Sequence, residues 1–209
     1  MINYGQIIYV VDDDVSICRS LKLLLEQHGF RVETFTHAEE FLRFKYPKLP
    51  SCLLLDIRMP GGMSGLALQE KMVERQLTIP IIFITSFGSI SMTVQAMKAG
   101  AIDFLPKPFT DEKLLKAIET AITKNKAQLK QQSEIAKIEE HINTLSPREL
   151  EVFHFVAKGM MNKQIASKRG KSLQTIKVHR GRVMCKMHAK TVTELIHFAQ
   201  KVGITSSQN

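Results

Sequence analysis

Short apolar runs alternate with longer amphipathic segments over the first 125 residues. The runs occupy residues 6–11, 31–35, 51–56, 79–85 and 101–107. Runs of this length are typical of buried strands, and the apolar residues between them recur at helical spacing. Two such helical stripes consist of Ile17, Leu21, Leu24 and Leu25 and of Leu66, Leu68, Met72 and Val73. Five alternating strands and helices predict an α/β domain with a doubly wound parallel sheet and right-handed crossovers.

The next segment, residues 124–142, is polar, lacks Gly and Pro and is rich in helix formers. We expect a long helix here that continues the last helix of the sheet domain. Its thin apolar stripe consists of Ile118, Ala121, Leu129, Ile135, Ile138 and Ile142. A flexible linker is the alternative, and Asn125 and Gln132 interrupt the apolar seam that a coiled coil needs.

Residues 143–209 have the pattern of an all-α domain of four helices. The first helix is expected to start at a capping box of Ser146 and Glu149, with Pro147 at its first position, and to end at Gly159. Asn162 is expected to cap the second helix, Gly170 to form the turn after it, and Thr191 to cap the fourth helix. A short helix, a tight turn and a basic third helix over residues 172–187 predict a helix-turn-helix motif, whose second helix enters the DNA major groove.

The third helix divides into a core face and an outward face. Ile176, Val183 and Met187 follow the spacing of buried residues. The same spacing turns Lys177, Val178, Gly181 and Arg182 toward solvent or DNA.

Charge is unevenly distributed along the chain, whose formal net charge is +9. Residues 1–125 contain 14 basic and 14 acidic residues, whereas residues 126–209 contain 15 and 6. Between Lys158 and Lys190 there are ten basic residues and no acidic one. Such a stripe is typical of a surface that binds the phosphate backbone of nucleic acid, the alternative being a cationic face that serves only solubility.

The length of 209 residues suits two small domains better than one large one. The sequence contains no apolar run of the roughly 20 residues that a bilayer span needs and no secretory leader, so we expect a cytoplasmic protein that does not contact the membrane. The three cysteines, Cys18, Cys52 and Cys185, share no metal-binding spacing. We interpret them as reduced packing residues.

Three consecutive carboxylates, Asp12, Asp13 and Asp14, follow the first apolar run. Two unit charges about 4 Å apart repel by roughly 4 kcal/mol at an effective dielectric near 20, so the cluster needs solvent, a proton or a cation. Asp14 also suits the cap of a helix that begins near Val15.

Polar residues also end three other strands: Asp56, Thr85 and Lys107. Because ligands bind beyond the carboxyl ends of parallel strands, these side chains are expected to converge. The carboxylates favour Mg²⁺, beside which Asp56 can act as a nucleophile toward phosphorus. Lys107 would then pair with phosphoryl oxygens, and the Thr85 hydroxyl would hydrogen-bond to the new phosphoryl group.

The stretches "VVDDD", "LLLDIRMP", "FITS" and "AMKAGAIDFLPKPF" resemble the receiver domain of two-component response regulators over residues 5–123. The resemblance implies a flavodoxin-like fold. It implies that Asp56 accepts a phosphoryl group from a sensor histidine kinase and that Mg²⁺ is held by Asp12, Asp13, Asp56 and the Arg58 carbonyl. It also implies that Thr85 and Phe104 are a switch pair, that Lys107 contacts phosphate and that the bond from Lys107 to Pro108 is cis.

One feature departs from this family. The loop glycine, Gly65, lies nine residues after Asp56 instead of the usual eight, with an extra glycine at position 61 or 62. Loop length costs little entropy, so we expect the fold to survive, whereas the lifetime of an acyl phosphate is open.

The stretches "LSPRELEV", "MNKQIA" and "TIKVHRGRVM" resemble the LuxR-type output domain of FixJ/NarL response regulators over residues 143–203. The resemblance implies DNA binding by Lys163, Gln174, Thr175, Lys177, Val178, His179, Gly181 and Arg182. Arg169 and Lys171 stand where the family commonly has apolar residues. We therefore expect either outward-pointing side chains or a looser turn, and a less stable domain.

Together these features predict a receiver at residues 1–123, a helical linker at 124–142 and a DNA-binding domain at 143–209. The predicted function is phosphorylation-dependent regulation of transcription, without enzymatic turnover. The expected partners are a sensor histidine kinase, promoter DNA, a second copy joined through the receiver when phosphorylated and, as a further option, RNA polymerase. The alternatives are a phosphorelay or interaction module whose basic region docks an acidic partner, and a phosphoester-hydrolysing enzyme that uses Asp56.

Overall fold

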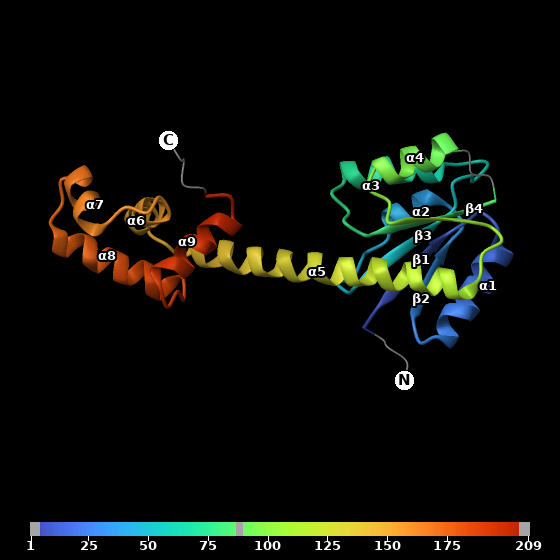
Figure 1. The fold of residues 1–209 in the computed structure, drawn as a ribbon, viewed down its shortest axis with the longest axis horizontal. Coiled ribbons are helices and arrows are strands. Elements are labelled where there is room, and N and C mark those ends of the chain that lie inside the picture. Colours follow the sequence, from blue (N-terminus) through green and yellow to red (C-terminus); the bar gives the residue numbers. More distant parts are fainter. Residues whose placement is uncertain (1–4, 87–89, 205–209) are drawn as a thin grey trace. The chain divides into compact units, whose positions relative to one another are not determined.

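The computed structural model describes residues 5–86 and 90–204, and the chain separates into two compact units, Met1–Leu129 and Lys130–Asn209 (Figure 1). The first unit contains a five-stranded parallel sheet in the order β2-β1-β3-β4-β5. Its strands are β1 (Ile7–Val11), β2 (Arg31–Phe35), β3 (Ser51–Leu55), β4 (Ile81–Thr85) and β5 (Asp103–Pro106). The predicted doubly wound sheet is confirmed.

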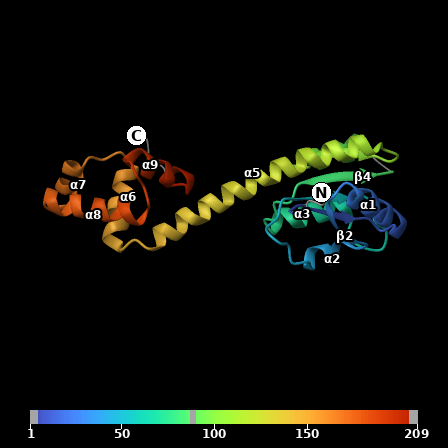
Figure 2. The same ribbon diagram turned by 90° about the horizontal axis from the view of Figure 1, so that it is seen from below.

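Helices cover both faces of this sheet (Figures 1 and 2). They are α1 (Val15–Gln27), α2 (Ala38–Arg43), α3 (Gly65–Glu74), α4 (Ile90–Lys98) and α5 (Asp111–Asn143). Successive residues of a strand point to opposite faces, so Ile8 and Val10 pack with α1 and α5, whereas Ile7 and Tyr9 pack with α2, α3 and α4. This double coverage explains why the central strands are continuous apolar runs.

The second unit is all helical. After the last turns of α5 it contains α6 (Pro147–Ala157), α7 (Asn162–Arg169), α8 (Leu173–Lys186) and α9 (Val192–Lys201). Phe153, Ile165, Ile176 and Leu195, one from each of these helices, are fully or almost fully buried in a common core. The capping box of Ser146 and Glu149 and the cap by Thr191 form as predicted.

Several local predictions were wrong. Val73, which the sequence placed in the apolar stripe of α3, is 65% exposed, whereas Leu68 and Met72 of the same stripe are buried. Asn162 is the first residue of α7 and Met161 is its cap; the Asn162 side chain accepts a hydrogen bond from Arg180 Nη1 at 2.6 Å. Cys185 is exposed on α8, so it is no packing residue, unlike Cys18 and Cys52.

The long helix α5 is continuous through the predicted linker. Asn125, read from the sequence as a break in a coiled-coil seam, is buried in the first unit. Its Oδ1 accepts a hydrogen bond from Ser51 N at 2.9 Å, and its Nδ2 donates to Thr78 O at 3.2 Å. The amide therefore anchors α5 to the amino-terminal ends of β3 and β4. Among the described residues, no helix combines the length and apolar character that a membrane crossing requires.

Candidate functional site

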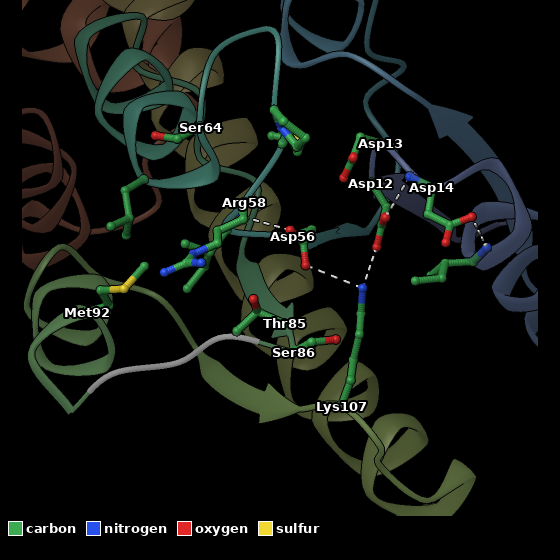
Figure 3. A pocket seen from close by; sticks show the side chains of 15 residues that line it. Asp12, Asp13, Asp14, Asp56, Arg58, Ser64, Thr85, Ser86, Met92 and Lys107 are labelled. Carbon is green, nitrogen blue, oxygen red and sulfur yellow. Dashed lines mark hydrogen bonds and ion pairs between the residues drawn. The ribbon is translucent and has the colours of Figure 1, made fainter.

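A cavity of about 720 Å³ lies at the carboxyl ends of the strands. Asp12 follows β1, Asp56 follows β3, Thr85 is the last residue of β4 and Lys107 follows β5, and all four line the cavity (Figure 3). Residues separated by up to 95 positions therefore meet because parallel strands end at the same edge of the sheet.

Lys107 joins the two buried carboxylates of this cavity (Figure 3). Its Nζ lies 2.6 Å from Asp12 Oδ2 and 3.3 Å from Asp56 Oδ1. Asp12 and Asp56 are only 1% and 6% exposed. A buried carboxylate is costly without a partner, so the ammonium group stabilises the cluster.

Asp56 is held in a defined orientation by the backbone that follows it. Its Oδ2 accepts a hydrogen bond from Arg58 N at 2.7 Å. Burial raises the pKa of the Asp56 carboxyl above its ordinary value, and the neighbouring Asp12 adds to this, whereas Lys107 and the Arg58 amide oppose it. The carboxyl is thus oriented and only partly neutralised, which suits a nucleophile.

The three consecutive aspartates have three different surroundings. Asp12 is buried, and its Oδ1 accepts a hydrogen bond from Asp14 N at 3.0 Å. Asp14 caps α1 by accepting from Ser16 N at 2.7 Å, as the sequence predicted. Asp13 is exposed at the cavity wall. Solvent, a helix terminus and a lysine therefore share the neutralisation of this charge.

The donors at this edge have the hard oxygen chemistry that suits Mg²⁺. However, the described residues contain no group of three Asp, Glu, His or Cys side chains arranged to hold a metal ion. Lys107 Nζ stands between the carboxylates of Asp12 and Asp56 (Figure 3). The donor set fits the ion in kind.

Thr85 is buried and lines the cavity. Phe104 is half-buried against the side of the sheet that α2, α3 and α4 cover. The bond from Lys107 to Pro108 is cis, as expected from the resemblance. Ser86 and Met92 also line the cavity, and Figure 3 shows them beside Thr85 and Arg58. The sequence did not assign Ser86 to the site, and it placed Met92 on the face expected to pair two receivers. Ser86 directly follows Thr85 at the end of β4, whereas Met92 belongs to α4 and lies outside the strand-end pattern.

The lengthened loop after Asp56 is accommodated by two glycines. Gly61 has a φ of +87°, a conformation that other residues adopt at a cost. At Gly65 a side chain is excluded, because a Cβ atom would lie 2.1 Å from Asp56 O. The backbone of α3 thus begins directly against the candidate nucleophile.

The outward residues of α8 form a second candidate site. Gln174, Lys177, Val178, Gly181 and Arg182 are exposed, as predicted. Lys163 is exposed on α7. Thr175 and His179 are partly buried; Thr175 Oγ1 lies 2.8 Å from the cap hydroxyl of Ser172. In the described part of the chain, His179 Nδ1 is buried without a hydrogen-bond partner.

Arg169 and Lys171 point outward, so no cation is buried beneath the turn. Arg169 Nη2 lies 2.6 Å from Glu151 Oε2. In the same domain Glu149, which is 3% exposed, accepts hydrogen bonds from Ser146 N at 2.9 Å and from Lys186 Nζ at 2.6 Å. The sequence predicted the capping bond of Glu149; its pairing with Lys186 was missed, because the partner lies 37 residues further on.

The chain is similar to known proteins over nearly its full length. Residues 8–119 match the response regulator receiver domain, and residues 143–199 match the bacterial regulatory proteins of the luxR family. Nodulation protein W of Bradyrhizobium diazoefficiens is 44% identical over 96% of this chain and 88% of its own length. The transcriptional regulatory protein FixJ of the same organism is 39% identical over 94% of this chain and 96% of its own length.

A solved structure supports the same assignment. The low-resolution structure of the response regulator StyR has a TM-score of 0.82 and 44% identity, and the match covers 94% of this chain and 99% of that one. The chain therefore belongs to the response regulators that combine a receiver domain with a LuxR-type DNA-binding domain, and it is a phosphorylation-dependent regulator of transcription.

Proposed function

We propose that Asp56 is the phosphoacceptor of this regulator. The convergence of Asp12, Asp56, Thr85 and Lys107 at one edge of the sheet supports this. In the proposed step a carboxylate oxygen of Asp56 attacks the phosphorus of a phosphohistidine on a sensor kinase. The phosphorus–nitrogen bond breaks, the electron pair stays on the imidazole, and an acyl phosphate forms on Asp56.

The residues placed to hold Mg²⁺ are Asp12, Asp13, Asp56 and the Arg58 carbonyl. When bound, the ion supplies neutralisation of negative charge on the phosphoryl oxygens. The Arg58 amide orients the attacking carboxylate. Lys107, which contacts Asp12 and Asp56 in this structure, is within reach of a phosphoryl group on Asp56.

Phosphorylation adds roughly one to two negative charges and new acceptor oxygens beside Thr85. We infer that Thr85 moves toward these oxygens, that Phe104 fills the space and that the surface of α4, β5 and α5 changes. Three apolar residues spaced as one stripe of α4 are exposed there: Ile90, Val94 and Met97. A second receiver covering this stripe is the dimer that we propose, with Met92, Lys98 and residues 108–114 around it.

Dimerisation places two copies of α8 on paired half-sites, so the second DNA contact becomes effectively intramolecular. In this proposal Lys177, Val178 and Gly181 face the bases. Lys163, Gln174, Thr175, His179 and Arg182 contact or approach the phosphate backbone. A DNA-binding function also implies a cytoplasmic location; contact with RNA polymerase remains a prediction.

The domain division at residues 1–123, 124–142 and 143–209 also remains a prediction; residues 1–4 and 205–209 lie outside the described part of the chain.

We further propose that the chain is no phosphoester-hydrolysing enzyme. Labelling should reach at most one phosphate per chain, whereas steady-state turnover of a phosphoester far beyond one equivalent would contradict this.

The decisive experiment compares the full chain with Asp56→Asn in the presence of Mg²⁺ and a small-molecule phosphodonor. The unsubstituted chain should incorporate phosphate and shift to a dimer by gel filtration, and the variant should do neither. Asp13→Asn should label more slowly, whereas Glu26→Gln, at an exposed position of α1 remote from the cavity, should behave like the parent chain. Retained labelling of Asp56→Asn contradicts the site.

DNA binding has a separate test. Affinity for a selected promoter fragment should fall steeply with salt, because bound cations are released from the phosphates. Lys163→Ala should reduce the slope of the logarithm of affinity against the logarithm of salt concentration by about one. Binding that is insensitive to salt favours an acidic protein partner for the basic domain.

A further inference from the structure

The loop between β3 and α3 contains one residue more than the receiver family usually has, and the structure shows what holds it. Its ends are joined by the hydrogen bond from Gly65 N to Ile57 O at 3.0 Å. Its middle turns at Gly61, and at this position a Cβ atom would meet nothing within 4 Å. Glycine at position 61 therefore suits the backbone conformation of the turn, and the contacts that hold the loop come from other residues.

The middle of the loop is held from α2. Glu39, in the first turn of that helix, accepts a hydrogen bond from Met63 N through Oε1 at 3.2 Å. The same carboxylate lies against Gly62, where a Cβ atom would be 3.6 and 3.8 Å from its two oxygens. Glu39 thus contacts two consecutive residues of the lengthened segment, 23 and 24 positions further along the chain.

This segment carries the groups that surround Asp56. Arg58 donates its amide to Asp56 Oδ2 at 2.7 Å, and its carbonyl is the backbone ligand proposed for Mg²⁺. A second cavity, of about 220 Å³, adjoins the loop and is lined by Asp13, Glu39, Met59, Gly62 and Met63 among others. Displacement of the loop into this space would move the Arg58 backbone relative to Asp56 and Asp13.

We propose that Glu39 is a positioning residue of the phosphoacceptor site: through Met63 N it fixes the lengthened loop so that the Arg58 amide and carbonyl keep their places. The proposal rests on the function assigned to Asp56. A hydrogen bond of this kind contributes roughly 0.5–1.5 kcal/mol, which corresponds to about a twofold to twelvefold change in an equilibrium constant. Loss of the carboxylate should weaken Mg²⁺ binding and slow phosphorylation by that factor.

The test uses the full chain with Glu39→Ala, Glu39→Gln and the matched control Glu40→Ala, whose parent side chain lies next to Glu39 and is exposed. Mg²⁺ affinity is measured by calorimetry, phosphorylation by labelling from a small-molecule donor, and the loop by amide hydrogen exchange at residues 57–64. Glu39→Ala should weaken affinity, slow labelling and speed exchange. Glu39→Gln keeps an oxygen acceptor and should stay near the parent chain, as should Glu40→Ala.

Two outcomes overturn the proposal. One is parent-like Mg²⁺ affinity and labelling in Glu39→Ala with only a lower melting temperature, which is what a structural role alone predicts. The other is equal impairment of Glu39→Gln and Glu39→Ala, which would assign the effect to charge. If Glu39→Ala fails to fold, Glu39→Asp, which withdraws the carboxylate by one methylene, takes its place. Failure of the parent chain to label at Asp56 would instead refute the proposed function, and the exchange measurement would still report on the loop.

Discussion

Lys107 Nζ lies closer to Asp12 Oδ2, at 2.6 Å, than to any atom of the candidate phosphoacceptor. The sequence assigned this lysine to phosphoryl oxygens, and in the structure it neutralises the carboxylates that are to receive Mg²⁺. A lysine and a divalent cation at the same carboxylates compete for them electrostatically. Under the proposed function, the position of Lys107 couples cation binding to the later contact with phosphate.

Lys107→Met should destabilise the receiver at neutral pH and make its stability depend more strongly on Mg²⁺. Removal of the ammonium group leaves two buried carboxylates without their shared partner, at a cost of about 1–3 kcal/mol. Added Mg²⁺ should restore more of this loss in the variant than it adds to the parent chain. Melting temperatures over a Mg²⁺ titration measure the effect, and Lys113→Met, at an exposed position of α5, is the control. An identical Mg²⁺ response in both chains would show that Lys107 does not compete with the ion.

Asp56→Asn should stabilise the receiver at pH 7. The pKa of Asp56 is raised in the folded state, chiefly by burial, so its contribution to stability is present below the ordinary value of 3.8 and is lost as pH rises through the raised value. The uncharged amide avoids this loss. The gain in melting temperature should therefore shrink as pH falls from 7 toward the raised pKa, and a gain independent of pH would contradict the assignment.

Much of the fold and part of the site follow from local pattern. The strands, Asp14 as a cap and the capping box at Ser146 depend on residues close together in sequence, and they form as predicted. The convergence of Asp12, Asp56, Thr85 and Lys107 followed from the expected sheet topology, but other contacts between distant residues did not follow. Asn125 bonds to a strand 74 residues earlier, and Glu39 bonds to a loop 24 residues later. A polar residue in such a contact has no periodic signal, because its partner is set by how the elements pack.

Glu149→Gln should destabilise the DNA-binding domain. Lys186 and the Ser146 amide lower the pKa of Glu149 to about 2, so its contribution to stability is present above the ordinary value of 4.5 and is lost as pH falls through about 2. We expect a cost of about 1–3 kcal/mol at neutral pH for the lost charge-assisted bond. Amide hydrogen exchange in α6 and α8 of the full chain measures it.

The control for this change is Glu194→Gln, which removes a charge from a similar capping position on α9. Glu194 accepts a hydrogen bond from the backbone amide of Lys190 at 2.8 Å. Glu149 likewise accepts from a backbone amide, but it also pairs with the side chain of Lys186. Its substitution should cost less. Equal effects of the two variants would mean that the pair with Lys186 adds nothing to the cap.

Gly181→Ala should strengthen α8 and weaken DNA binding. Glycine inside a helix costs roughly 0.8–1 kcal/mol relative to alanine, and here no packing requires it, because a Cβ atom would meet nothing within 4 Å. Its exposed neighbours Lys177 and Val178 belong to the surface proposed to face the bases, so the absent side chain permits close approach of the helix to DNA. Amide hydrogen exchange in α8 should slow, and the affinity for DNA should fall. The salt dependence of DNA binding should stay unchanged, because the phosphate contacts remain. Thr193→Ala, on the exposed side of α9, controls for helix propensity, and parent-like affinity of Gly181→Ala would show that the glycine is dispensable for binding.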